Sequence, residues 1–393
     1  MSQDLTLPSL QELFSANAVR VVEHIPARSR TLWATVLASE LDRARTQNSQ
    51  PAWTRLFMLA KCCLWVPDGA RGGRKSRGAE SIPAIVADRL RKWQQGSIAE
   101  LWESYQEQTK RSPPGRRPRK SPEEVQTARA KRLAAEGLFG RACEALASEG
   151  LFTRNPELIQ MLKDLHPQGH QVQPTQEDQA DPIEFSREGV KAGVESFNRL
   201  AGAGRSDLKP QHLKEAVGCK SPAAATVVLD KLTRLVNFLV AGEACPEVAP
   251  FLAGAPLHAG KKADGGVRPI AVGETLRRLV GKCCVGDSSI KDAVKQLLEP
   301  RQLGVGTRGG AEVLTRAATT IVQEHGHDPV MALLQIDSTN AFNPISRDKI
   351  LLEVDALLPS LSDWMRCCYE GDPISGTKKP RSIRQRTCNK DVC

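Results

Sequence analysis

The stretch Lys261–Val272, KKADGGVRPIAV, decides the fold prediction because it holds the first strand-like run after a long series of helical patterns. Two lysines precede a Gly-Gly turn, and a strand pattern follows it. This order predicts a β-hairpin that brings Lys262 and Arg268 close together at its tip. Such a pair suits a triphosphate, because lysine offers a point charge and arginine a planar fork of donors.

A second apolar run of strand length, Val330–Ile336, ends directly on Asp337. A carboxylate at the C-terminal end of a buried strand can project into a cleft and hold a divalent cation. Mg²⁺ prefers one or two carboxylates together with substrate phosphates. Because Phe342 follows shortly afterwards, the segment 337–343, DSTNAFN, is a candidate catalytic segment.

The rest of the chain has the periodicity of amphipathic helices, with apolar residues three and four positions apart. Ser9 and Glu12 have the spacing of a capping box at the start of the first helix. The predicted class is therefore mostly α with a small β component (α+β). Helices are expected within residues 8–66, 83–107, 121–165, 274–298 and 309–325, and from the second linker to about residue 253.

Shifts in composition divide the chain into six segments. The expected organisation is a helical N-terminal region (1–109), a basic Pro-rich linker (110–120), a helical segment (121–165), a polar linker (166–184), a mixed α and β region (185–374) and an unstructured tail (375–393).

The net charge of +10 favours a polyanionic partner, because contacts with phosphates release counterions. Two arginines follow the hairpin, and a basic group lies in the first linker. The arginines could equally form a solvated helix face, and the linker group a solvated linker or a nuclear-import signal. The candidate nucleic-acid contacts are Arg277, Arg278, Arg116, Arg117, Arg119 and Lys120.

The 11 cysteines include three adjacent pairs inside apolar runs, which predict small buried side chains in a reducing compartment. No other Cys or His lies at metal-ligand spacing from His212, so a structural hydrogen-bonding role is expected for this imidazole. The N-terminus does not have the pattern of a signal peptide, and no run is long and apolar enough to span a membrane. We therefore expect an intracellular protein, nuclear or cytoplasmic, without membrane partners.

Four motifs in a fixed order carry a resemblance to a known family. They are LKPQHL (208–213), KKADGGVRPIAVGETLRRLV (261–280), QLGVGTRGGAE (302–312) and DSTNAFNPISR (337–347). Together they resemble the reverse transcriptases of non-LTR (LINE-type) retrotransposons, in which the second is similar to the fingers motif and the last to palm motif A. The resemblance covers about residues 185–370. It implies partial fingers, the start of a palm, and the chemistry of an RNA-directed DNA polymerase.

The resemblance implies roles for particular residues. Asp337 would be the catalytic carboxylate that binds the Mg²⁺ ions, and Ser338 would offer a main-chain group to the metal or the nucleotide. Phe342 would lie under the sugar and select against ribose, while Lys262 and Arg268 would hold the triphosphate. The implied reaction is two-metal nucleotidyl transfer, with an RNA template, a DNA primer and a dNTP as partners.

The sequence departs from the family pattern after motif A. Neither the Gln-Gly-Asp-Pro segment nor the paired aspartates of the palm follow Asp337. Two metal ions need more than one carboxylate, so we expect a truncated polymerase that is inactive alone, and enzymatic activity is left open. The alternatives are a non-catalytic basic nucleic-acid-binding protein and a degenerate retroelement product.

Overall fold

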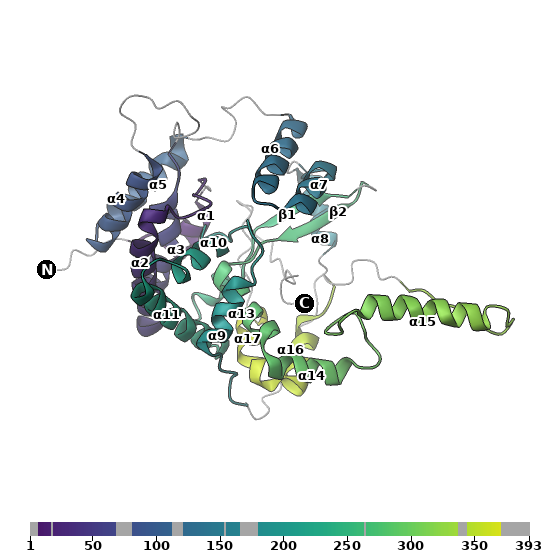
Figure 1. The fold of residues 1–393 in the computed structure, drawn as a ribbon. Coiled ribbons are helices and arrows are strands. Elements are labelled where there is room, and N and C mark those ends of the chain that lie inside the picture. The colour runs from purple at the N-terminus through teal and green to yellow at the C-terminus, as the bar shows by residue number, and fades with distance from the viewer. Residues whose placement is uncertain are drawn as a thin grey trace.

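The computed structural model describes residues 7–16, 19–67, 81–111, 121–152, 155–165, 180–262, 265–336 and 344–370. Helices dominate these residues and two strands supply the β component, which confirms the predicted fold class (Figure 1). None of the described helices is long and apolar enough to cross a membrane.

The α-helices up to residue 325 largely follow the expected ranges, whereas the helices after residue 346 were not predicted from the sequence. Two short 3-10 helices are also present. The bounds are α1 (Leu10–Ser15), η1 (Ala27–Ser29), α2 (Arg30–Gln47), α3 (Gln50–Leu64), α4 (Ile82–Gln94), α5 (Ile98–Arg111), α6 (Pro122–Ala135), α7 (Phe139–Ala147), α8 (Pro156–Asp164), α9 (Arg187–Glu195), α10 (Pro210–Val217), α11 (Pro222–Val240), α12 (Ala249–Ala253), α13 (Thr275–Gly286), α14 (Ser288–Leu298), α15 (Gly310–His325), α16 (Arg347–Leu357), η2 (Pro359–Leu361) and α17 (Ser362–Tyr369).

Local sequence explains where several helices begin. The predicted capping box of α1 is present, with the Ser9 hydroxyl accepting from the Glu12 amide and the Glu12 carboxylate accepting from the Ser9 amide. Seven of the α-helices carry proline in their first turn, where its fixed φ and missing N–H cost nothing. These helices are α3, α4, α6, α8, α10, α11 and α12.

One hydrophobic core joins the N-terminal helices to the region 185–369. Helix α11 packs along α2, and the buried side chains of both belong to one continuous cluster that runs from Leu10 to Tyr369. The Trp33 indole donates to the His212 carbonyl at 3.0 Å, which adds a polar link between the two regions. The two regions therefore fold as one unit in spite of their separation along the chain.

The predicted hairpin is present, with β1 (Leu257–Lys261) and β2 (Val267–Ala271) paired antiparallel (Figure 1). Leu151 extends the sheet through an isolated antiparallel bridge to Gly260. Leucines of α8 pack with Ala259 and Val267 on one side of the sheet. The segment 121–165 is thereby attached to the hairpin.

The prediction of a second strand at Val330–Ile336 is wrong. This segment follows the protruding helix α15 and has irregular structure (Figure 1). Its side chains are solvated, with Val330 86%, Leu334 80% and Ile336 78% exposed. A strand needs a neighbour for its amides and carbonyls, and the described residues offer none here.

We expect Leu232→Ala to destabilise the protein by about 2–5 kcal/mol, because Leu232 of α11 is fully buried in the shared core. Urea unfolding followed by tryptophan fluorescence and by circular dichroism should give coincident transitions, since one core joins both regions. Val227→Ala on the same helix is the control, because Val227 is 48% exposed and should change stability by about 0.5 kcal/mol or less. Two separate transitions would contradict the single core.

Candidate functional site

The hairpin has one packed face and one open face. Because side chains alternate along a strand, the register that pairs Gly260 with Arg268 puts Lys262, Gly260 and Arg268 on one face. The Lys262 amide donates to the Gly266 carbonyl at 2.9 Å and closes the turn. Lys262 and Arg268 are both exposed. The predicted pair thus lies together on the open face.

Lys261 differs from its neighbour Lys262. It lies on the packed face, where its ammonium group is 5.5 Å from the centre of the Phe152 ring. Its amide donates to the Gly150 carbonyl at 3.0 Å. Two adjacent lysines therefore face opposite sides of the same hairpin, which gives a natural internal control.

The hairpin is held at its base by the buried carboxylate of Glu274. This carboxylate accepts from the Ser206 amide at 3.1 Å and from the Ser206 hydroxyl at 2.6 Å. Burial raises the pKa of Glu274, and the Ser206 hydrogen bonds oppose that shift. Gly204 lies so close that an added Cβ would be 2.6 Å from the carboxylate. Only glycine fits at this position, and neither Glu274 nor Gly204 was singled out from the sequence.

Two of the family-like motifs meet at this point. The Thr275 hydroxyl donates to the Leu208 carbonyl at 2.5 Å, so the start of α13 lies against the segment 208–213. Beside it, Lys61 of α3 forms an ion pair of 2.8 Å with Asp207. The hairpin base is therefore tied to the core through several polar contacts.

His212 is fully buried and structural, as expected. Its Nδ1 accepts from the Lys209 amide at 3.2 Å, and its Nε2 donates to the Val22 carbonyl at 3.0 Å. Burial lowers the pKa of His212 to about 3, so the ring is neutral. Because both ring nitrogens form hydrogen bonds, the neutral ring links the start of α10 to the segment around Val22.

The two arginines of α13 occupy different environments. Arg277 is only 2% exposed, donates to the Ala253 carbonyl at 2.7 Å, and lies 5.8 Å from the Tyr369 ring centre. The expectation that Arg277 is a surface contact for nucleic acid therefore does not fit its position, because the core encloses the guanidinium. Arg278 is half-buried and lies 5.6 Å from the Phe197 ring centre.

The remaining predicted site residues lie outside the described part of the chain. They are Asp337, Ser338, Phe342, Arg116, Arg117, Arg119 and Lys120. Within the described residues, no group of three or more His, Cys, Asp or Glu side chains could hold a metal ion.

The motif at 302–312 forms the turn that opens α15. Gly309 is the N-cap and has a left-handed φ of 71°, which favours glycine.

Of the six cysteines in adjacent pairs, five are buried, and Cys367 is half-buried. These thiols fill space in the core, as the apolar surroundings of the pairs predict.

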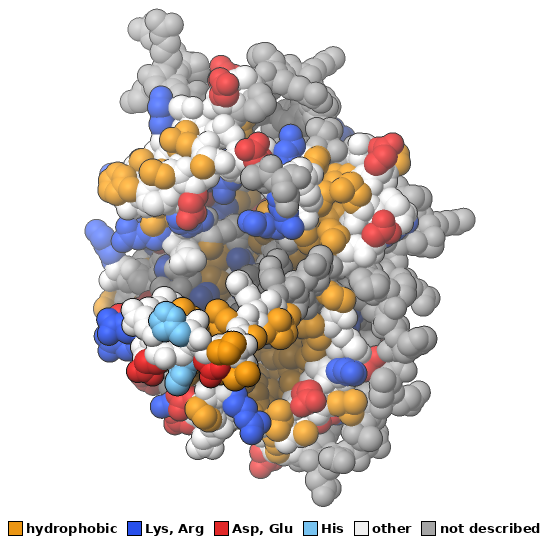
Figure 2. Space-filling view, turned by 90° about the vertical axis from the view of Figure 1, so that its right-hand side faces the viewer, with side chains coloured by type: hydrophobic (Ala, Val, Ile, Leu, Met, Phe, Trp, Pro, Cys, Tyr) orange, Lys and Arg blue, Asp and Glu red, His pale blue; other side chains and the backbone are white. Residues whose placement is uncertain are grey.

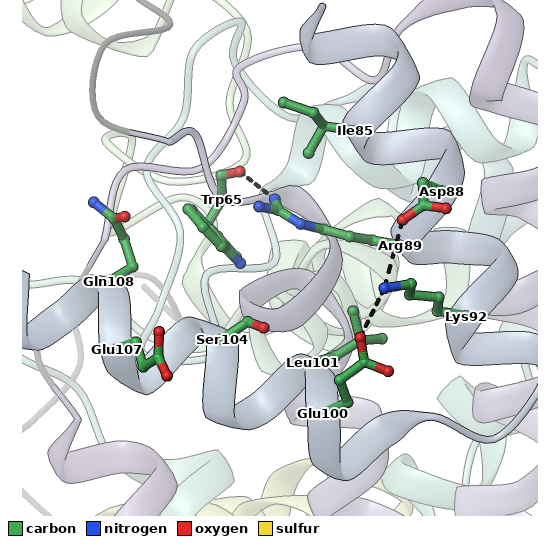
Figure 3. A pocket seen from close by; sticks show the side chains of 10 residues that line it. All are labelled: Trp65, Ile85, Asp88, Arg89, Lys92, Glu100, Leu101, Ser104, Glu107 and Gln108. Carbon is green, nitrogen blue, oxygen red and sulfur yellow. Dashed lines mark hydrogen bonds and ion pairs between the residues drawn. The ribbon is translucent and has the colours of Figure 1, made fainter. Parts of the chain in front are cut away.

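A pocket of about 340 Å³ lies between α4 and α5 (Figure 3). The Arg89 guanidinium stacks 3.6 Å from the Trp65 ring centre and donates to the Trp65 carbonyl at 2.6 Å. Lys92 forms ion pairs with Glu100 at 2.7 Å and with Asp88 at 3.9 Å. The cations here are engaged within the protein, and none of the family-like motifs contributes to the pocket.

Comparison with known proteins adds no family name, because no family model and no curated protein matches this sequence. Any function of this chain has therefore to be inferred from its residues and their geometry.

The neutral state of His212 predicts a dependence of stability on pH. Its contribution is complete above pH 6.5 and is lost as the pH falls from 6.5 towards about 3, because the unfolded chain binds the proton first. The loss should reach about 4–5 kcal/mol at most. Urea unfolding at several pH values measures it. His212→Gln has no titrating ring, so its stability should fall less steeply, and equal slopes for both proteins would contradict the assignment.

Proposed function

We propose that this chain carries the front part of a reverse-transcriptase domain and that its hairpin binds the triphosphate of an incoming nucleotide. The observation that carries the proposal is the β1–β2 register, which puts Lys262 and Arg268 on one exposed face. The order of the four motifs supports the same conclusion.

The electrostatics of the open face favour a phosphate ligand. No ion pair of Lys262 or Arg268 occurs within the described residues, so both charges face solvent without a carboxylate there. An arginine fork and a lysine ammonium group together can contact several oxygens of a polyphosphate. The hairpin base is fixed by Glu274, so the pair is presented on a supported element.

The chemistry of the proposed domain requires more than this hairpin. Asp337 would hold Mg²⁺ together with the substrate phosphates, Ser338 would contact the metal or nucleotide, and Phe342 would face the sugar. The partners would be an RNA template, a DNA primer and a dNTP. One carboxylate is too few for two metal ions, so we propose a domain that binds nucleotide and does not polymerise alone.

Replacing both Lys262 and Arg268 by alanine should weaken the binding of a fluorescent dNTP by roughly tenfold or more, because each removes a charge-assisted contact. Lys261→Ala is the matched control for Lys262→Ala alone, since each removes one positive charge and the two side chains lie on opposite faces of the hairpin. Fluorescence anisotropy measures the affinities. Equal weakening by Lys261→Ala and Lys262→Ala would show that net charge alone matters.

Primer extension on an RNA template with Mg²⁺ and dNTPs tests the expected lack of polymerisation. The chain should extend no primer, because the second metal ion lacks its carboxylate. Gel analysis of a labelled primer measures this. Incorporation that disappears in Asp337→Ala would contradict the prediction and show that the chain is an active polymerase.

A further inference from the structure

A group of cations surrounds the loop between α9 and α10, away from the hairpin tip. The group comes from three helices and from the loop itself. It is called the basic cluster below and consists of Arg141 of α7, Arg199 of the loop, Lys214 of α10, and Arg278 and Lys282 of α13.

Main-chain carbonyls fix the positions of these cations. The Lys214 ammonium group donates to the carbonyls of Glu195 at 3.0 Å and Phe197 at 2.7 Å. Lys282 donates to the neighbouring Ser196 carbonyl at 3.3 Å. These bonds also satisfy the carbonyls at the C-terminal end of α9, where positive charge is favourable.

The remaining members lie beside the same loop. The Arg141 guanidinium donates to the Arg199 carbonyl at 2.8 Å. Arg278 and Lys282 lie 5.6 Å and 5.1 Å from the centre of the Phe197 ring. Cation–π contact and carbonyl bonds hold long side chains in place, so their conformational entropy is already reduced before a ligand binds.

The positive charge of the basic cluster is not balanced locally. Within the described residues no ion pair forms to Arg141, Arg199, Lys214 or Lys282. The pKa of Lys214 is lowered by its partial burial and further by the charges of Arg199 and Lys282. The Glu195 carboxylate opposes these effects. The cations still repel one another, so binding of an anion would lower their electrostatic free energy.

The face from which α15 projects carries positive charge. Figure 2 shows Lys and Arg side chains gathered in and beside a hollow across the middle of this face. Phe197 is only 4% exposed, so its ring is not available for stacking on a base or for insertion into a bilayer. The basic cluster therefore offers charge without base recognition.

We propose that the basic cluster binds the phosphate backbone of a single nucleic-acid strand without regard to base sequence. Several cations around one loop can contact more than one phosphate of a nucleic-acid strand. Because carbonyls hold the cations in place, little order has to be created on binding. Such binding does not depend on the polymerase proposal, since it would occur equally in a binding protein without chemistry.

The test is binding of labelled single-stranded RNA and DNA over a range of salt concentrations, followed by fluorescence anisotropy. In Arg199→Gln/Lys282→Gln the affinity should fall roughly tenfold, and the slope against salt should fall by about 0.7 for each phosphate that is no longer neutralised. Lys92→Gln is the control for Arg199→Gln alone, because each change removes one positive charge. Lys92 is paired with Glu100 at 2.7 Å, so the slope should stay unchanged in the control.

Each outcome decides the proposal. Thermal unfolding checks the double variant, and Arg199→Gln alone replaces it if folding fails, since Arg199 is exposed. An unchanged slope in the folded variant would overturn the proposal, as would tighter binding to anionic phospholipid vesicles than to oligonucleotides. Loss of strand binding with retained dNTP binding separates this site from the hairpin. Failure of dNTP binding alone affects only the proposed function.

Discussion

The buried carboxylate of Glu274 fixes the position of the hairpin. Burying a carboxylate is costly unless donors surround it, and Ser206 supplies both an amide and a hydroxyl. The close approach requires glycine at position 204, because any Cβ there would collide with the carboxylate. The Lys61–Asp207 ion pair of 2.8 Å continues the polar contacts toward α3. The hairpin is therefore attached to the same core that the N-terminal helices build. These contacts fix the orientation of its exposed face relative to that core.

The basic residues of the chain are used in two distinct ways. Arg55 pairs with the buried Glu40 at 2.7 Å, and Arg277 is enclosed by the core, so these cations stabilise the fold. Lys214 and Lys282 instead contact carbonyls, which satisfy hydrogen-bond donors but leave the net charge in place. A charge held by carbonyls is both ordered and uncompensated, which is the condition that favours binding of an external anion. The net charge of the chain does not reveal which cations stabilise the fold and which carry uncompensated charge.

Local features of the structure could be predicted from the sequence, and features set by distant partners could not. The capping box at Ser9, the helices and the hairpin depend on neighbouring residues, and all are present. The burial of Arg277 depends on Ala253 and Tyr369, which no periodicity within α13 reveals. The contact between Gly204 and Glu274 joins positions far apart in the chain. The packing of α11 on α2 likewise could not be predicted without knowing which helices are neighbours in space.

The exposed segment Val330–Ile336 bears on the proposed chemistry but not on the proposed nucleotide binding. An apolar run becomes a strand only when neighbours satisfy its backbone and cover its side chains, and here Leu334 is 80% exposed. Among the described residues, no strand pairs with this segment. The hairpin has no such dependence, because Glu274, Ser206 and α8 support it from within the described core. The proposed phosphate recognition by Lys262 and Arg268 would therefore need only elements that the described residues contain, whereas the proposed chemistry would also need strands that pair with Val330–Ile336.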